Sequence, residues 1–219
     1  TAITASDTDK VSAHLTSRVG VALPAAPTLL SANILKAADQ DTYDPTYFGA
    51  KTDGSADCSV ALNTIVSAII ASDLPAKPIS IAGVMRIDQP INIDRTAITT
   101  NPEISLSPQI RFIGRGPTAS QIYSTHAGPA ITYLGNSSTA LHTFFAMRCL
   151  SLRGPARARG SIGLRLEKMA YAHFEEVDVT GYEFGVDALD LLSTTFIRTT
   201  IRKNIYGIRC RQRNVSAPN

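Results

Sequence analysis

The chain reads GLRL at residues 163–166, GVDA at 185–188 and GIRC at 207–210, so a similar phrase returns every 22 residues. Phe174 and Phe196 are separated by the same interval. Each phrase places small or apolar residues on either side of a charged one, as in a short β-strand with one buried face. A fixed interval of this length is typical of repeats that cover each other's apolar faces. The pattern therefore predicts an all-β solenoid, a parallel β-helix.

The 22-residue interval also predicts charged columns, because equivalent residues of stacked strands lie roughly 4.8 Å apart. This register places Asp187 between Arg165 and Arg209, and it places Glu176 beside Arg198. Opposite charges that face each other across paired strands contribute roughly 0.2–1 kcal/mol. We therefore expect these acids to be ionised partners of arginines rather than catalytic groups.

Composition excludes several classes of protein. The 219 residues are 44% hydrophobic and 18% charged, an ordinary balance for a folded chain. No run approaches the ~18–20 apolar residues that cross a bilayer, so we expect no membrane insertion. The net charge of +3 is small and spread along the chain, so we expect no nucleic-acid partner.

The three cysteines are few and scattered. A disulfide framework or a metal site requires paired ligands at short spacing, so we expect no metal and no cofactor. We interpret Cys149 and Cys210, which stand at apolar strand positions, as small core residues.

The chain divides into three regions. Residues 1–42 favour two short helices, which we interpret as a segment for attachment or oligomerisation. Residues 43–77 contain a loop and an amphipathic helix at about 59–72, with Asp57 or Ser59 as its cap. We expect this helix to cover the open end of the solenoid. Residues 78–219 form the coils, and we expect these to continue beyond residue 219 because no capping element follows the last one.

Three pairs of apolar residues that precede a glycine indicate how successive coils align. We expect each pair to occupy the same place in its coil. The pairs are Ile110 and Phe112 before Gly114, Leu150 and Leu152 before Gly154, and Val177 and Val179 before Gly181. The intervals shorten as inserted loops disappear, and the last insertion is residues 155–161.

The start of the coil region resembles a known family. The run FGAKTDGSADCSVALNTIVSAI (48–69) precedes strand-like ISIAGVMRI (79–87) and PINI (90–93), and QIRFIGRG follows at 109–116. This order resembles the N-terminal part of the pectate-lyase-like right-handed β-helix superfamily, in which a phrase like FGAKGDGxTDDTxAIQxAI leads into a capping helix. Thr52 replaces the usual glycine and Cys58 the second aspartate. The resemblance covers about residues 43–125 and implies a right-handed parallel β-helix with an N-terminal capping helix.

That superfamily includes polygalacturonases, exopolysaccharide lyases and many bacteriophage tailspikes. The resemblance implies the N-terminal part of a tailspike or receptor-binding protein that binds a bacterial surface polysaccharide, with depolymerisation left open. It also implies a homotrimer, attached to phage tail or baseplate proteins through the N-terminal segment, in a virion or outside the cell. Two alternatives stay open: a secreted pectinase-like lyase or hydrolase, and a structural or adhesin β-helix without catalysis.

Catalytic residues are difficult to select. A glycoside hydrolase needs carboxylates that converge on one face. Among the acids of the regular coils, Asp178 has Ser151 and Thr200 as its column neighbours, and we expect it to be uncommitted. Asp178 is therefore the candidate catalytic residue within these coils. The resemblance also implies the alternative that the catalytic residues lie beyond residue 219, since the active groove of such relatives usually draws on middle and later coils.

The basic run RGPARAR at 153–159 supplies candidate contacts to an anionic glycan: Arg153, Arg157 and Arg159. Tyr171 is a candidate platform for a sugar ring, since sugars present apolar C–H faces to aromatic side chains. The alternative for the basic run is a solvated loop.

Overall fold

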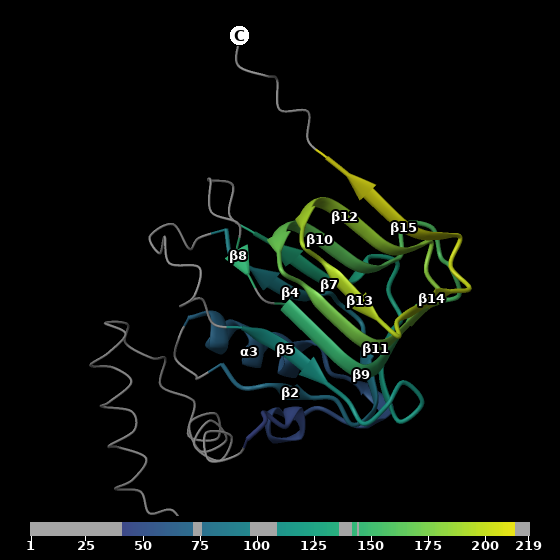
Figure 1. Cartoon of the computed structure of the whole chain (residues 1–219). Helices are drawn as coiled ribbons and strands as arrows, with labels where there is room; N and C mark the ends of the chain where they lie inside the picture. The colour runs from purple at the N-terminus through teal and green to yellow at the C-terminus, as the bar shows by residue number, and fades with distance from the viewer. Residues whose placement is uncertain (1–40, 72–75, 97–108, 136–141, 144, 213–219) are drawn as a thin grey trace, which may run out of the picture. The chain divides into compact units, whose positions relative to one another are not determined.

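The computed structural model describes residues 41–71, 76–96, 109–135, 142–143 and 145–212 (Figure 1). These residues form a mostly β structure with parallel sheets and two helical elements, η1 (Pro45–Phe48) and α3 (Ser59–Ile70). The helices expected before residue 40 lie outside the described residues, and so do residues 213–219.

The described strands belong to two sheets, and neighbouring strands pair in parallel in both. The nine-stranded sheet contains β1 (Asp53–Asp57), β2 (Ile79–Ser80), β3 (Gly83–Ile87), β5 (Ile110–Ile113), β6 (Ser120–Ser124), β9 (Phe145–Arg153), β11 (His173–Thr180), β13 (Thr195–Ile197) and β14 (Thr200–Arg202). The six-stranded sheet contains β4 (Ile91–Asp94), β7 (Pro129–Leu134), β8 (His142–Thr143), β10 (Ile162–Ala170), β12 (Phe184–Leu192) and β15 (Tyr206–Arg211).

From β9 onward the chain alternates between the two sheets and builds three successive layers. We name them the β9–β10 layer (residues 145–171), the β11–β12 layer (172–193) and the β13–β15 layer (194–212). Val186 pairs with Leu164 on one side and with Ile208 on the other. These pairs confirm the predicted register of 22 residues.

Close approach of the backbone explains the repeated glycine. A Cβ at Gly163 would lie 2.5 Å from the carbonyl oxygen of Gly185 and 2.6 Å from a methyl of Val179. Real Cβ atoms do not approach other atoms so closely, so only glycine fits between these layers. At Gly207, in the β13–β15 layer, the same atom would meet nothing within 4 Å.

The expected alignment of the earlier coils is partly wrong. Strands β5 and β6 lie end to end along β9, and Ile110 pairs with Phe145 rather than with Leu150. The loop at residues 114–119 separates β5 from β6, so this insertion interrupts a strand in the middle of the sheet. The strand before Gly114 therefore pairs with the first half of β9, whereas the glycine pattern predicted the second half.

The later alignment is confirmed. Leu150 pairs with Val177 and Leu152 with Val179. The loop at residues 155–161 lies between β9 and β10, where the next layer makes a shorter connection between β11 and β12. This loop stands at one corner of the stacked strands.

Helix α3 begins where the sequence predicts and ends at Ile70, slightly earlier than expected. The expected cap is wrong, because the N-cap residue is Cys58, whose side chain makes no capping hydrogen bond, rather than Asp57 or Ser59. Oδ1 of Asp57 accepts hydrogen bonds from the backbone N–H of Ser59 at 2.9 Å and of Asp88 at 3.0 Å. This carboxylate satisfies a free N–H at the helix start. It also connects the helix to the turn before β4.

Asn63 of α3 contacts the backbone of β4, which is the end strand in the order of the six-stranded sheet. Its Nδ2 donates to the carbonyl oxygen of Pro90 at 2.9 Å, and its Oδ1 accepts from the N–H of Asn92 at 2.8 Å. The helix thus pairs with backbone groups that a neighbouring strand would otherwise use.

Left-handed backbone conformations recur at equivalent positions of the layers. Cys149, Glu176 and Arg198 have φ of 55°, 54° and 46°. Lys203 (φ 54°) follows Gly181 (φ 83°) by one repeat. Non-glycine residues rarely adopt this conformation. The stacking of the layers, rather than residue preference, therefore determines these corners.

The core lies between the two sheets. Phe145 of β9 packs edge-on against Phe112 and Phe174, with ring centroids 6.1 and 5.7 Å away, and its centroid is 6.0 Å from that of Tyr133 in β7. All four rings are at most 1% exposed. The aromatic row continues to Phe196, which stacks on Phe174 at 4.9 Å.

Candidate functional site

Basic and aromatic side chains align across the nine-stranded sheet. Register pairs Arg86 with Tyr123, Tyr123 with Arg153, Arg153 with Thr180, and Thr180 with Arg202. These residues alternate along their strands with the buried Met85, Ile122, Leu152 and Val179, so they belong to the outer face. This row of side chains runs across several successive strands.

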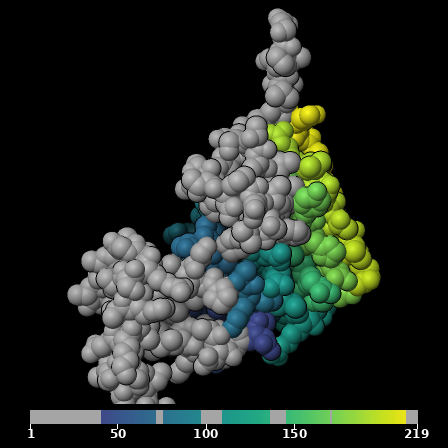
Figure 2. Space-filling view, turned by 60° about the vertical axis from the view of Figure 1, so that its left-hand side comes forward, coloured from purple at the N-terminus to yellow at the C-terminus, as the bar shows by residue number. Residues whose placement is uncertain are grey.

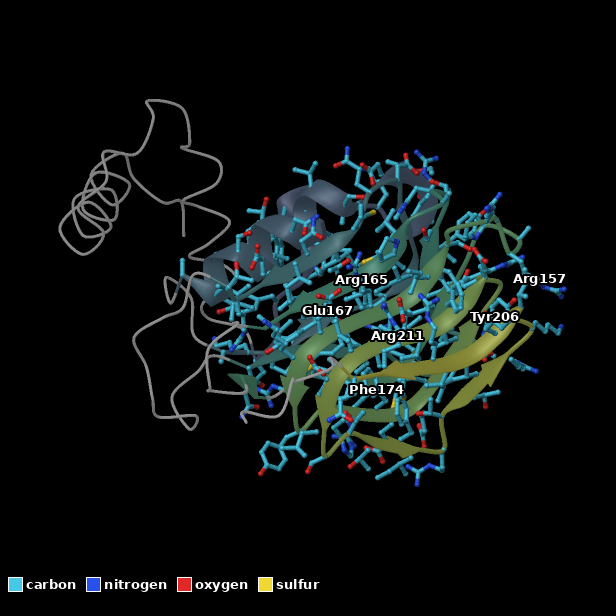
Figure 3. The ribbon with its side chains drawn as sticks, turned by 90° about the horizontal axis from the view of Figure 1, so that it is seen from above. Arg157, Arg165, Glu167, Phe174, Tyr206 and Arg211 are labelled. Atoms are coloured by element: carbon cyan, nitrogen blue, oxygen red, sulfur yellow. The ribbon has the colours of Figure 1, made fainter. Side chains whose placement is uncertain are left out.

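A hollow opens at this row, where β11 ends beside the loop at 155–161. Its lining consists of Tyr123, Arg153, Gly154, Ala156, Arg157, Thr180, Gly181 and Lys203. Among the described residues, that lining contains three cations and no carboxylate. Viewed from above, Arg157 lies at the margin of the molecule, away from Arg165 and Glu167 (Figure 3).

Backbone contacts hold the basic groups in place. The Nε of Arg157 donates to the carbonyl oxygen of Lys203 at 2.9 Å, and the Arg157 N–H donates to Gly181 O at 2.6 Å. The guanidinium of Arg153 lies 5.8 Å from the ring centroid of Tyr123, within the range of a cation–π contact. Because these partners are neutral, the positive charge of the hollow is not cancelled within its lining.

Two glycines in the lining of the hollow, Gly154 and Gly181, lie in close contact. A Cβ at Gly154 would lie 2.4 Å from the carbonyl oxygen of Gly181, so the two turns touch through their backbones. Lys203 adopts the left-handed conformation one repeat after Gly181. The layer register thereby brings Lys203 to the hollow, although it is far in sequence from the 153–159 run.

The arrangement suits an anionic group next to an apolar sugar face. Arginine and lysine donate charge-assisted hydrogen bonds to carboxylate, sulfate or phosphate oxygens. An aromatic ring at the same place can contact the C–H face of a sugar.

Asp178 is not the uncommitted acid that the sequence suggested. Its neighbours in the sheet are Ser151 and Thr200, as expected. However, its carboxylate forms an ion pair with Arg202 at 2.9 Å. The expectation considered only residues directly opposite, whereas a long side chain reaches a diagonal neighbour.

A second acidic group also lies among cations. Glu175 pairs with Arg148 at 2.8 Å and with Arg198 at 2.7 Å, and Arg198 also pairs with Glu176 at 3.0 Å, as the register predicts. Hydrogen bonds from the Cys149 thiol and from Arg198 lower the pKa of Glu176 below its usual range. A carboxylate with a lowered pKa is poorly suited to donate a proton as a general acid.

Asp187 is 3% exposed and binds two arginines, one of which was not expected. Its carboxylate accepts from Arg209 at 2.8 and 2.7 Å and from Arg211 at 3.0 Å. Arg165 instead pairs with Glu167 of its own strand at 2.6 Å. Burial raises the pKa of Asp187, but the hydrogen bonds and charges of Arg209 and Arg211 outweigh it and hold that pKa below the usual value.

The interpretation of two cysteines as core residues is wrong. Cys149 is half-buried at a left-handed corner, and Cys210 is exposed in β15, whereas Cys58 is buried. The Cys149 thiol donates to Oε2 of Glu176 at 3.2 Å, and that bond raises the thiol pKa. Within the described ranges, no group of three or more His, Cys, Asp or Glu is arranged to hold a metal ion.

The structure brings together two of the four predicted glycan contacts. Arg153 and Arg157 line the hollow, whereas Arg159 is exposed on the same loop outside the lining. Tyr171 is 50% exposed at the other end of β11, roughly 25 Å away along an eight-residue strand.

The sequence alone does not indicate Lys203 as a residue of this site, and it offers Tyr123 only as one of several tyrosines that could stack on a sugar ring. The signal for Lys203 was present in the sequence, because it follows Gly181 by 22 residues. Tyr123 required the correct alignment of β6 with β9.

No protein-family model matches the chain, and no curated protein matches its sequence. Among solved structures, the chain is similar to ORF18 of Geobacillus virus E2, with a TM-score of 0.59 and 21% sequence identity. The alignment covers 75% of this chain and 30% of that one, so this chain spans less than a third of the viral protein's length. The likeness shows a shared fold.

Two other solved structures are more distant. The Agl-KA catalytic domain has a TM-score of 0.48 and 16% identity, over 80% of this chain and 35% of that chain. The A-module of the mannuronan C-5 epimerase AlgE4 from Azotobacter vinelandii has a TM-score of 0.39 and 13% identity, over 76% and 53%. Neither likeness adds an argument about this chain. In the part of the chain that the structure describes, no helix combines the length and apolar character needed to cross a membrane.

Proposed function

We propose that this chain is the N-terminal part of a bacteriophage tailspike or receptor-binding protein that binds an acidic bacterial surface polysaccharide. The proposal treats the stacked layers as a right-handed parallel β-helix, with α3 covering its N-terminal end. The basic hollow is the glycan-binding site. An acidic residue of the glycan contacts Arg153, Arg157 and Lys203, and a neighbouring sugar ring packs against Tyr123.

One observation carries the proposal: three cations and a tyrosine line one hollow that has no carboxylate among its described lining residues. On the rest of the later layers, arginines such as Arg198, Arg202 and Arg209 are paired with acids. Unpaired positive charge is therefore concentrated where a groove is also present. Such a place favours an anionic ligand.

Binding is better supported than cleavage by these residues. Glu175, Asp178 and Asp187 each form ion pairs with arginine. A hydrolase requires one acid that is protonated near neutral pH and a second carboxylate at a suitable distance. The proposal therefore assigns recognition, and no chemical step, to the described surface.

The phage context is carried over from the shared fold with the Geobacillus virus E2 protein and from the motif at residues 48–69. It implies a virion or extracellular location and a homotrimer that attaches to tail or baseplate proteins through residues 1–42. Light scattering of the purified chain tests the trimer. A monomer at micromolar concentration contradicts that part of the proposal and leaves the glycan site unaffected.

The site is tested by binding to a panel of acidic and neutral capsular and lipopolysaccharide glycans. We expect binding to at least one acidic glycan, and weaker binding as salt rises. The double variant Arg153→Ala, Lys203→Ala should lower affinity at least about tenfold, since a hydrogen bond to a charged group contributes about 1.5–3 kcal/mol.

Arg165→Ala is the matched control, because it removes an exposed arginine from the other sheet. It should leave binding unchanged. Absence of binding to every glycan contradicts the function. Binding that survives the double variant contradicts the site.

A further inference from the structure

The three later layers alternate in charge. The β11–β12 layer carries six acids and neither Lys nor Arg: Glu175, Glu176, Asp178, Glu183, Asp187 and Asp190. The β13–β15 layer carries five basic residues and no acid: Arg198, Arg202, Lys203, Arg209 and Arg211. The β9–β10 layer carries six basic residues and the single acid Glu167: Arg148, Arg153, Arg157, Arg159, Arg165 and Lys168. Each boundary between these layers therefore joins opposite charges.

Ion pairs cross both boundaries. Glu175 is paired from one side by Arg148 at 2.8 Å and from the other by Arg198 at 2.7 Å. Asp187 pairs with Arg209 and Arg211 of the next layer at 2.7 and 3.0 Å. Acids in a layer thus receive partners from the layers that flank it.

Within the described residues, the β13–β15 layer has oppositely charged partners on one side only, in the β11–β12 layer. Side chains of Arg198 and Arg202 are 61% and 60% exposed, although each already contacts an acid. Apolar residues share this exposed face, and Tyr206 and Ile208 are 54% and 50% exposed. In the space-filling view this layer forms a continuous margin of the molecule (Figure 2).

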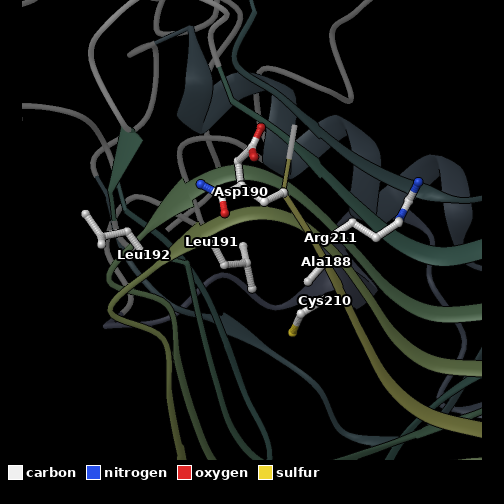
Figure 4. A pocket seen from close by; sticks show the side chains of 7 residues that line it. Ala188, Asp190, Leu191, Leu192, Cys210 and Arg211 are labelled. Atoms are coloured by element: carbon white, nitrogen blue, oxygen red, sulfur yellow. The ribbon is translucent and has the colours of Figure 1, made fainter. Parts of the chain in front are cut away.

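Among the described residues, the outer edge of this layer is open. Strand β15 is the end strand of the six-stranded sheet as described, so its outer backbone groups have no described partner strand. A Cβ at Gly207 would have no neighbouring atom within 4 Å, whereas a Cβ at the equivalent Gly185 would lie 2.6 Å from a methyl of Ile201. Beside β15, a hollow is lined by Ala188, Asp190, Leu191, Leu192, Cys210, Arg211 and Gln212 (Figure 4).

We propose that this face binds an acidic polypeptide segment, which adds a parallel strand layer to β13, β14 and β15. The segment places carboxylates beside Arg198, Arg202 and Arg209, and it covers Tyr206 and Ile208 with apolar side chains. The backbone edge decides in favour of a polypeptide over an anionic glycan, since every second residue of the strand directs its N–H and C=O groups to that edge, where another strand can pair with them. The inference is independent of the proposed glycan site.

The chain contains a suitable probe. Residues 172–193 carry the six carboxylates and pair with the β13–β15 layer from the other side. A labelled peptide of this sequence is titrated against the full chain, and binding is measured by fluorescence anisotropy. The control peptide replaces the six carboxylates with amides. We expect the acidic peptide to bind and the amide peptide to bind at least about tenfold more weakly, a difference of about 1.4 kcal/mol.

Hydrogen exchange locates the contact. With free peptide at ten times its Kd, exchange of the protected β15 amides should slow about tenfold. The variant Ile208→Asp should abolish this protection, and because Ile208 is half exposed we expect the variant to fold. Arg165→Ala, which removes an exposed arginine of β10 that pairs with Glu167 of its own strand, should leave the protection unchanged.

Three results overturn the proposal: equal binding of the amide peptide, protection that survives Ile208→Asp, and failure of both peptides to bind. Protection of β15 by an acidic polysaccharide but not by the acidic peptide overturns the assignment of a polypeptide. None of these results bears on the variants Arg153→Ala and Lys203→Ala, so the proposed function is tested separately.

Discussion

The β11–β12 layer and the β13–β15 layer follow the same 22-residue pattern but differ in how they are covered. Phe174 and Val186 are fully buried, whereas their counterparts Phe196 and Ile208 are 37% and 50% exposed. The pattern determines which residues lie above one another. Burial requires a further layer on the other side. Equivalent substitutions in the two layers should therefore have unequal effects on stability.

The largest contrast is expected for phenylalanine. Phe174→Ala should lower the free energy of unfolding by about 3–5 kcal/mol, because it leaves a cavity beneath the Phe145 ring. Phe196→Ala should cost less than half as much, since its ring is packed on one face only. Chemical denaturation of both variants measures the difference, and equal losses would show that the two layers are equally covered in solution.

Glycine gives the next contrast. Gly163→Ala should destabilise the chain by about 1–3 kcal/mol, because the new methyl meets the Gly185 carbonyl and Val179. Gly207→Ala should change stability by less than about 0.5 kcal/mol, since the added atom meets nothing. Thermal unfolding compares them. If Gly163→Ala leaves the thermal stability unchanged, close approach of the backbone does not explain the repeated glycine.

Acid should weaken the contact between the two layers. The folded-state pKa of Asp187 lies below its ordinary value of 3.8, so its contribution is complete above that value and is lost as pH falls through the folded pKa. Asp187→Asn should cost about 1–2 kcal/mol at pH 7. The thermal midpoints of the two proteins should begin to converge as pH falls below that ordinary value. A gap that stays constant down to acid pH contradicts the assignment.

The smallest effect is expected at an exposed pair. Glu176→Gln removes a carboxylate that Arg198 binds at 3.0 Å, and Arg198 is 61% exposed. Exposed pairs contribute about 0–1 kcal/mol and are screened by salt. We expect a loss in that range that disappears in 1 M salt. A larger, salt-independent loss would indicate that the Cys149 thiol bond is the important contact of Glu176.

The sequence predicted the later layers well because their columns contain the same kinds of residue at a constant interval. Leu164, Val186 and Ile208 could be aligned without other information. The predicted alignment of the earlier coils was wrong because an insertion falls inside a strand. Gly154 stands at a corner, whereas Gly114 stands where a strand is interrupted. A glycine alone does not distinguish these two uses.

The candidate site was predicted only in part, for a related reason. Arg153, Arg157 and Arg159 are neighbours in the sequence, but the hollow is formed by residues that meet through the register. Tyr123 and Lys203 come from other layers. Ion pairs were mispredicted at Arg165 because the choice between a partner two residues away and one across the sheet depends on side-chain geometry.

The left-handed corners have a practical consequence for engineering. Ser193 and Lys168 hold φ of 51° and 52°, a conformation that costs an ordinary residue about 1–2 kcal/mol and costs glycine nothing. Ser193 and Lys168 lie outside the hollow, whereas Ala156, Arg157 and Lys203, which adopt the same conformation, belong to its lining. Replacing Ser193 or Lys168 by glycine, one position at a time, would relieve this strain and give a more stable scaffold whose recognition surface is unchanged.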